Sequence, residues 1–167
     1  MKQPTRKEGM ERAQRSKGRS VHERTIRLLA RRAHGMAELK QKLIAKGESP
    51  AQVQSELEDC RERGLLDDTA FAYQRTMSRI AGKGYGPVRV RGELLGLGLD
   101  PEDVARGMAR ALEELDLDAV LAGVLEKRCG KWQREGGAAD DRHARKRCFD
   151  LLYRRGFDID TIHRVLS

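Results

Sequence analysis

The segment LLGLGLDPEDV at residues 94–104 decides the fold, because it contains the end of one helix and the beginning of the next. Gly98 can adopt the left-handed conformation that ends a helix at its C′ position. Asp100 is a favourable N-cap for a following helix, and Pro101 suits the first helical position, where its missing N–H costs nothing. The segment therefore predicts two helices joined by a tight turn.

The same pattern occurs three times along the chain. Gly47, Gly98 and Gly156 each follow a leucine by four residues and precede a Ser or Asp by two. Apolar residues stand six and ten positions after each glycine, a spacing typical of one helix face. The repeated positions are Leu43, Leu94 and Leu152; Ser49, Asp100 and Asp158; Val53, Val104 and Ile162; and Leu57, Met108 and Leu166. A helix, a glycine stop, an N-cap and a second helix thus recur.

A further helix is predicted before each of these pairs, so each repeat has three helices. Its expected N-terminal signals are the capping box Ser20–Glu23, Asp68 and Asp118, and a second capping box is predicted at Ser49–Gln52. The strand-like stretch 88–91 is interpreted as the start of a helix, because Leu94 and Leu97 follow Val90 at helical spacing.

We therefore predict an all-α protein of three tandem degenerate three-helix repeats in an elongated array. Stacked repeats would share a core that one three-helix repeat is too small to build alone. The predicted repeats are residues 21–66, 67–115 and 116–167, and they follow a basic tail, residues 1–20. The tail has seven basic, two acidic and only three apolar residues, which predicts disorder.

The chain carries a net charge of +8, which favours a polyanionic partner: nucleic acid first and a membrane surface second. Charge is also sorted along it. Residues 27–46 contain six bases and one acid, and residues 48–68 contain seven acids and two bases. Residues 75–91 contain five bases and no acid, residues 102–118 contain six acids and two bases, and residues 142–155 contain six bases and one acid.

Each basic run by itself could be an ordinary solvated helix face or could pair with a neighbouring helix. Three such runs at the same place in three repeats favour a basic stripe instead. A stripe of this kind suits an elongated anionic partner, such as a nucleic-acid strand or a nucleoprotein filament, held through phosphates rather than by base reading.

No catalytic, cofactor or metal site is expected. The sequence contains no P-loop, HExxH or G-x-S-x-G motif. The four histidines lack ligand spacing and are expected at the surface or at helix ends. The three cysteines form no CxxC pair, which indicates a reducing cytoplasm, and Cys60 and Cys148 fall at core spacing. No run is long and apolar enough for a membrane span.

Several motifs resemble those of the RecX family of regulatory proteins. They are Gly64-Leu65-Leu66-Asp67-Asp68 with Phe71-Ala72, Gly84-Tyr85-Gly86-Pro87-Val88-Arg89-Val90-Arg91 with Glu93-Leu94, Arg31-Arg32-Ala33-His34 with Glu38-Leu39, and Leu151-Leu152-Tyr153-Arg154-Arg155-Gly156-Phe157. The resemblance spans residues 22–167. In this chain Gly35 stands where the family usually has a Ser-type cap.

This resemblance implies a non-enzymatic modulator of the RecA recombinase. Members of the family look like curved arrays of three-helix units that lie in the groove of the RecA–DNA filament and restrain strand exchange, ATP hydrolysis and coprotease activity. It implies a monomer that acts on the RecA filament and its single-stranded DNA in DNA repair and the SOS response, away from membranes. The candidate contact residues are Arg31, Arg32, Arg79, Lys83, Tyr85, Arg89, Arg91, Arg145, Lys146, Arg147, Arg154 and Arg155.

Two other functions remain open at this point. The first is a stand-alone DNA-binding protein of helix-turn-helix type, but a base-reading helix usually carries Asn, Gln or Ser among its arginines, and the second helices here have almost none. The second is a membrane-surface protein, which requires bulky apolar residues opposite a basic face, and the basic tail lacks them.

Deletion of residues 1–20 tests the prediction for the tail. The melting temperature should stay nearly unchanged, because the tail has too few apolar residues to be buried, whereas attraction to DNA should weaken with the loss of basic charge. Thermal unfolding followed by circular dichroism measures the first effect. A fall of several degrees would show that the tail docks on the folded part.

Overall fold

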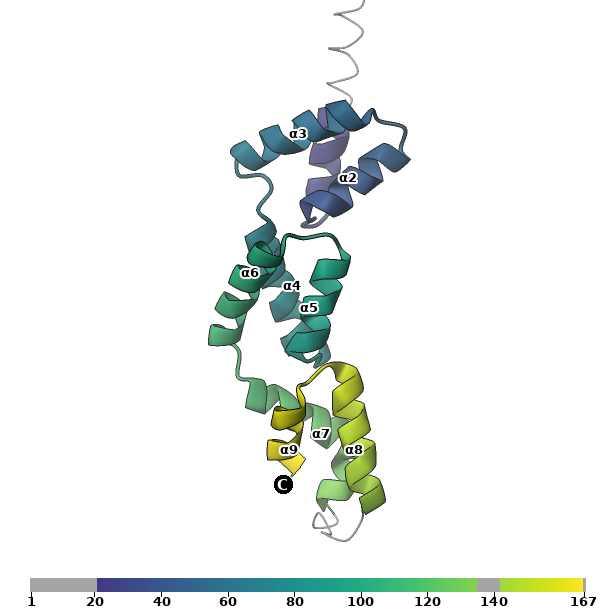
Figure 1. Cartoon of the computed structure of the whole chain (residues 1–167), viewed down its shortest axis with the longest axis vertical. Coiled ribbons are helices and arrows are strands. Elements are labelled where there is room, and N and C mark those ends of the chain that lie inside the picture. Colours follow the sequence, from purple (N-terminus) through teal and green to yellow (C-terminus); the bar gives the residue numbers. More distant parts are fainter. Residues whose placement is uncertain (1–20, 135–141, 167) are drawn as a thin grey trace, which may run out of the picture. The chain divides into compact units, whose positions relative to one another are not determined.

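The computed structural model describes residues 21–134 and 142–166 of the 167-residue chain. The predicted tail and Ser20 of the first capping box lie outside these residues. The described part forms nine helices and contains no strand, which confirms the all-α prediction (Figure 1). After a first helix at residues 21–29 come α2 (Met36–Ala45), α3 (Pro50–Glu62), α4 (Asp68–Lys83), α5 (Pro87–Gly96), α6 (Pro101–Glu114), α7 (Leu117–Arg134), α8 (Arg142–Arg155) and α9 (Ile159–Leu166).

Contacts divide the described chain into two compact units. The first unit contains residues 21–71 and 97–99, and the second contains residues 72–96 and 100–166. In chain order the helices form three sets of three, as the sequence repeat predicts. The stretch 88–91 lies inside α5, so its interpretation as helix is confirmed.

The three repeated glycines end their helices as predicted. Gly47, Gly98 and Gly156 have φ angles of 85°, 81° and 85°, which side chains with a Cβ rarely adopt. At Gly47 the amide donates to the carbonyl of Ile44 at 2.9 Å, and the Glu48 amide donates to that of Leu43 at 3.2 Å. The segment around Gly156 has the same two bonds, so both turns are Schellman motifs that satisfy the last carbonyls of the helix.

The N-caps of the repeat differ from one another. Asp100 accepts a hydrogen bond from the Glu102 amide at 2.8 Å, and Asp158 accepts one from the Thr161 amide at 2.8 Å, as predicted. Ser49 makes no side-chain cap bond, so the predicted Ser49–Gln52 capping box is wrong. A neutral hydroxyl at an exposed helix end can bind water instead, whereas a carboxylate also gains from the helix dipole.

The predicted caps Asp68 and Asp118 are wrong by one and two positions. The Ala70 amide donates to the Asp67 carboxylate at 2.8 Å, and the Ala119 amide donates to the Asp116 carboxylate at 2.9 Å. In each helix the third amide thus binds the side chain of the N-cap residue, which stands three positions before it. Asp68 instead accepts from the Met36 amide at 2.9 Å and so caps α2, where Gly35 has no side chain to do so.

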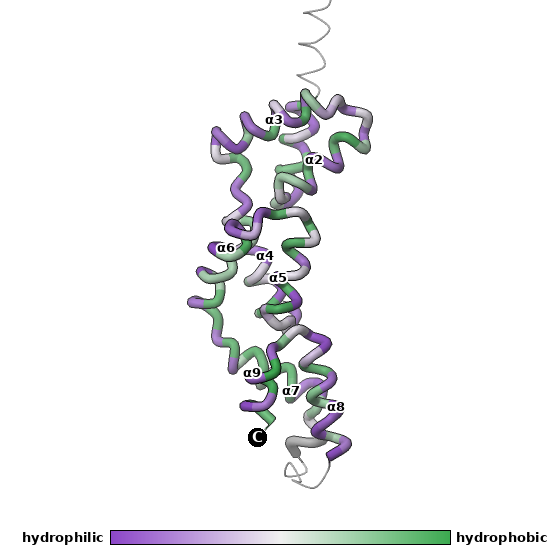
Figure 2. Tube along the Cα trace, viewed as in Figure 1, coloured by the Kyte–Doolittle hydropathy of each residue, from purple (hydrophilic) through white to green (hydrophobic). Residues whose placement is uncertain are grey.

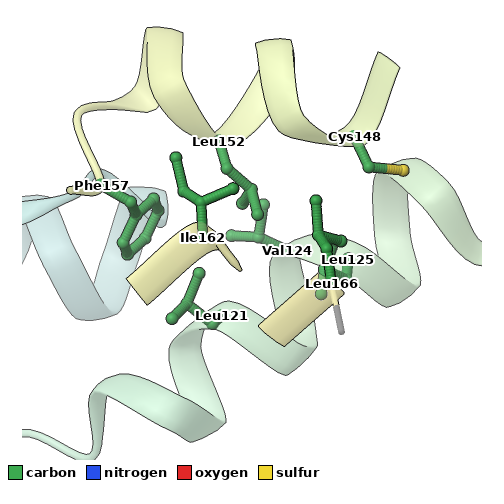
Figure 3. Close-up of a cluster of buried hydrophobic side chains, with 8 residues drawn as sticks. All are labelled: Leu121, Val124, Leu125, Cys148, Leu152, Phe157, Ile162 and Leu166. Carbon is green, nitrogen blue, oxygen red and sulfur yellow. The ribbon is translucent and has the colours of Figure 1, made fainter. Parts of the chain in front are cut away.

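Each unit has its own apolar core. In the first unit the core contains the predicted residues Leu43, Val53, Leu57 and Cys60. In the second unit, seven side chains from α7, α8 and α9, together with Phe157 of the turn between α8 and α9, form one buried cluster (Figure 3). Burial raises the pKa of the Cys60 and Cys148 thiols to about 12, so both stay protonated near neutral pH, and their predicted core positions are confirmed.

The difference between the caps is measurable by substitution. Asp100→Ala should lower the free energy of unfolding by about 1 kcal/mol, because the Glu102 amide loses its acceptor. Ser49→Ala is the matched control, since a proline also follows Ser49 and no cap bond is lost; it should cost much less. Urea unfolding followed by circular dichroism gives both values. Equal losses would contradict the assignment of the Asp100 cap.

Candidate nucleic-acid interface

Candidate contact residues in the first unit are Arg31 and Arg32, just after the first helix. Arg32 pairs with Glu38 and also donates to the Ala33 carbonyl at 3.0 Å. Arg31 is exposed, and its side chain has no hydrogen bond or ion pair among the described residues. The neighbouring cations therefore differ: Arg32 is held by the fold, whereas Arg31 is available to a partner.

Glu38 binds several basic groups at once. Its carboxylate lies 2.8 Å from Lys42 Nζ and 3.1 Å from His34 Nδ1, in addition to its pair with Arg32. Partial burial acts to raise the pKa of Glu38, but the bonds from Arg32, Lys42 and His34 outweigh it and lower the pKa to about 2. His34 is only 4% exposed, so it is not a surface residue, although it lies at a helix end, directly before Gly35, the N-cap of α2. This histidine is buried beside the carboxylate four residues after it.

In the second unit, Glu93 of α5 holds two arginines of α4. Arg79 donates to it through Nε at 3.0 Å and Nη2 at 2.6 Å, and Arg75 donates through Nε at 3.1 Å. Burial acts to raise the pKa of Glu93, but these bonds prevail and lower it. The candidate Arg79 thus serves first to fasten α4 to α5.

The Gly84–Pro87 connection forms a joint with the turn after α8. The Gly86 amide donates to the Arg155 carbonyl at 2.7 Å, and the Val88 amide donates to the Gly156 carbonyl at 3.1 Å. A Cβ on Gly86 would collide with the Gly156 backbone, so only glycine permits this approach. We call these contacts the backbone joint.

Side chains reinforce the backbone joint. Arg155 Nη1 donates to the carbonyls of Lys83 at 2.7 Å and Gly84 at 2.9 Å, which are left unpaired at the end of α4. Arg89 donates to the Arg154 carbonyl at 3.2 Å and stacks over the Tyr85 ring at 4.2 Å. Tyr85, Arg89 and Arg155 therefore have intramolecular contacts, and a role for them toward a partner stays a prediction.

The candidate contact residues on α8 also fall into two groups, those with partners inside the fold and those without. Hydrophilic residues occupy much of α8 (Figure 2). Arg154 donates from Nε to the Asp150 carbonyl at 3.2 Å, and Arg147 has a partner within the fold. Arg145 and Lys146 are exposed and make no side-chain hydrogen bond or ion pair within the described residues.

Five candidates thus have no side-chain partner in the described part of the chain, and we call them the free cations. They are Arg31, Lys83, Arg91, Arg145 and Lys146. An unpaired exposed cation contributes little to folding but can neutralise a phosphate and release a counterion. Lys127 and Arg128 of α7 are two further exposed cations without side-chain partners among the described residues, and they were not among the predicted contact residues. Both lie outside the three basic runs of the sequence, which gave no reason to select them.

Within residues 21–134 and 142–166, no helix is long and apolar enough to span a bilayer. The same residues contain no group of three or more His, Cys, Asp or Glu side chains placed to hold a metal ion.

Sequence comparison finds matches to two models of RecX domains. Residues 67–108 match the model described as RecX, second three-helix domain, and residues 116–166 match RecX, third three-helix domain. A protein named Regulatory protein RecX from Xanthomonas axonopodis pv. citri (strain 306) is 36% identical over 151 residues, covering 90% of this chain and 88% of the relative. One of the same name from Halorhodospira halophila (strain DSM 244 / SL1) is 38% identical over 151 residues, covering 89% and 87%.

The fold is also similar to solved structures. The crystal structure of RecX from Lactobacillus salivarius has a TM-score of 0.78 to this chain at 14% sequence identity, and the match covers 90% of this chain and 95% of that one. At this identity the likeness concerns the fold alone.

The contacts of Glu38 predict a pH-dependent stability. Its pKa is lowered from 4.5 to about 2 in the folded state, so its contribution is fully present above pH 4.5 and is lost as the pH falls through 2. Glu38→Gln should therefore destabilise the protein by about 1 kcal/mol at neutral pH, a value reduced by solvent screening of the partly exposed partners.

Urea unfolding at a series of pH values measures this effect. The difference between Glu38→Gln and the parent should shrink between pH 4.5 and 2. Glu62→Gln is the control, because Glu62 is exposed at the end of α3 and has no side-chain partner in the described part. A pH-independent difference would mean that the ion pairs of Glu38 do not stabilise the fold.

Proposed function

The chain belongs to the RecX family of regulatory proteins, and from this premise we propose that it binds the RecA–DNA filament and modulates RecA, mainly as an inhibitor. Inhibition would act on recombinase, ATPase and coprotease activities and so regulate DNA repair and the SOS response. We propose that it does so by binding alone, as a cytoplasmic monomer without a cofactor.

The observation that carries the proposal is the division of cations in the structure. Arg32, Arg75 and Arg79 are neutralised by carboxylates of their own unit. The free cations occur in both units, and no carboxylate of the described residues pairs with them. Cations left unpaired by the fold are suited to phosphates, whose neutralisation gives salt-dependent binding without sequence specificity.

A stand-alone DNA-binding protein is the alternative. The free cations are all Arg or Lys, which contact phosphates readily, and the α5 and α8 sequences PVRVRGELLG and RHARKRCFDLLYRR contain no Asn, Gln or Ser to read base edges. A filament therefore fits these helices better than a specific duplex site. Co-sedimentation with RecA filaments, compared with naked single-stranded DNA at moderate salt, separates the alternatives.

The test of function replaces Arg31, Arg91 and Arg145 with Gln and leaves the fold's own ion pairs intact. The parent protein should co-sediment with RecA filaments and inhibit DNA-dependent ATP hydrolysis by RecA. The triple variant should inhibit several-fold more weakly, and the slope of log affinity against log salt should fall by roughly 2, at about 0.7 per lost phosphate contact.

The matched control replaces Arg61, Arg63 and Arg110, which lie in the acidic runs, and removes the same number of positive charges. Arg61 has no side-chain ion pair within the described residues, and Arg63 and Arg110 are each 3.6 Å from a carboxylate in exposed pairs. Arg110 also stacks over the Tyr73 ring at 4.4 Å. Exposed contacts of this kind contribute little, so the control should stay folded and inhibit like the parent. Equal effects of the two triple variants would mean that only net charge matters. A parent that neither co-sediments nor inhibits would overturn the proposed function.

A further inference from the structure

A basic groove lies beside the backbone joint, between the end of α4 and the face of α7 in the second unit. Its volume is about 480 Å³. Lys83, Lys127, Arg128 and Arg155 line it together with small residues that include Gly82 and Gly123. All belong to one compact unit, so the groove is formed within that unit.

The charged side chains that line this groove are basic. None of the described residues that line it is acidic. Arg155 already donates to the carbonyls at the end of α4, whose partial negative charge offsets part of its own. Lys83, Lys127 and Arg128 have exposed side chains with no partner among the described residues. Three unpaired cations around one concave surface produce a positive potential that an anion would relieve.

The glycines of the groove differ from those of the joint. A Cβ on Gly84 would collide with the Val124 side chain, so packing explains that glycine. A Cβ on Gly82 or Gly123 would meet nothing within 4 Å. A glycine inside a helix lowers the helix's stability by roughly 1 kcal/mol relative to alanine, and alanine would fit at both positions, so the fold does not require Gly82 or Gly123. Their effect is to keep the groove open and the backbone accessible.

The groove is also held rigidly. Gly84 lies directly against Val124 of α7, and Arg155 ties the end of α8 to the end of α4. The backbone joint adds two hydrogen bonds at the next residues. Cations on elements fixed in this way need little reorganisation to bind a ligand, which favours affinity.

We propose that this groove binds the phosphodiester backbone of a single-stranded nucleic acid, with Lys83, Lys127 and Arg128 contacting phosphate oxygens. This binding site depends on the proposed function in one respect only: if the protein binds the RecA–DNA filament, the strand in the groove is the DNA of that filament. A flexible single strand can bend its backbone into a concave site of this size, whereas a duplex is stiff over the same length. Among the described residues no aromatic side chain lines the groove, so the contacts we propose are to phosphates rather than to stacked bases, and binding is independent of sequence.

The test measures binding of the full-length protein to a fluorescein-labelled oligothymidylate, by anisotropy and without RecA. Replacing Lys83, Lys127 and Arg128 with Gln should weaken binding by roughly 10- to 100-fold at about 0.1 M salt and reduce the salt slope by roughly 2. An oligoadenylate should give the same result, because phosphates alone are contacted.

Two further variants make the test specific. Gly123→Leu fills the groove while keeping every charge, and it should fold well because leucine favours a helix and the site has room. It should also weaken binding several-fold. Replacement of Arg61, Arg63 and Arg110 with Gln is again the control for net charge and should bind within about twofold of the parent.

The inference is overturned if the parent does not bind the oligonucleotide, or if either groove variant binds like the parent. Inorganic phosphate at constant ionic strength should compete poorly; efficient competition would assign the groove to free phosphate instead. Because the binding assay contains no RecA, a protein that fails to bind the oligonucleotide could still inhibit RecA, and the proposed function would stand without the groove. Conversely, a protein that binds DNA through the groove without affecting RecA would refute the proposed function alone.

Discussion

The hydrogen bonds from the amides of Gly86 and Val88 to the carbonyls of Arg155 and Gly156 are the contacts on which the second unit depends. Buried backbone groups need partners, and these bonds join two helix ends that would otherwise leave donors and acceptors unpaired. The approach is possible only because Gly86 has no side chain, since a Cβ there would collide with the Gly156 backbone. The Gly-Tyr-Gly-Pro motif is therefore first a structural joint, and its cations take their positions from it.

Carboxylates decide which cations remain available. Glu38 and Glu93 each bind more than one basic side chain and keep a lowered pKa despite partial burial. The basic residues around them are thereby committed to folding, although in the sequence they belong to the same runs as Arg31 and Lys83. A charged run in a sequence thus overstates the charge that a partner meets, because part of it is neutralised inside the fold.

Local rules predicted much of this structure. The glycine stops at Gly47, Gly98 and Gly156, and the caps at Asp100 and Asp158, depend on neighbouring residues and could be identified from spacing. Some departures from the sequence prediction depend on tertiary structure: Asp68 caps α2 across 32 residues, and His34 is buried. Others are local, since Ser49 makes no cap bond and Asp116 rather than Asp118 caps α7. The groove could not be predicted, because Lys83 and Lys127 lie on different helices, 44 residues apart, and line the same groove only in the folded unit. No sequence period connects them.

Residues 83–86 serve the joint and the proposed groove at once, and this overlap limits how either can be altered. Gly84 and Gly86 cannot carry a side chain without disturbing the joint, and removal of Arg155 would leave the carbonyls of Lys83 and Gly84 unpaired. Changes at these positions would therefore alter folding and binding together. On α7, by contrast, Gly123 and the heads of Lys127 and Arg128 are not used by the joint. Adjustments of the groove's affinity that preserve the fold are therefore expected on α7 and at the Lys83 side chain, of which the joint uses only the carbonyl.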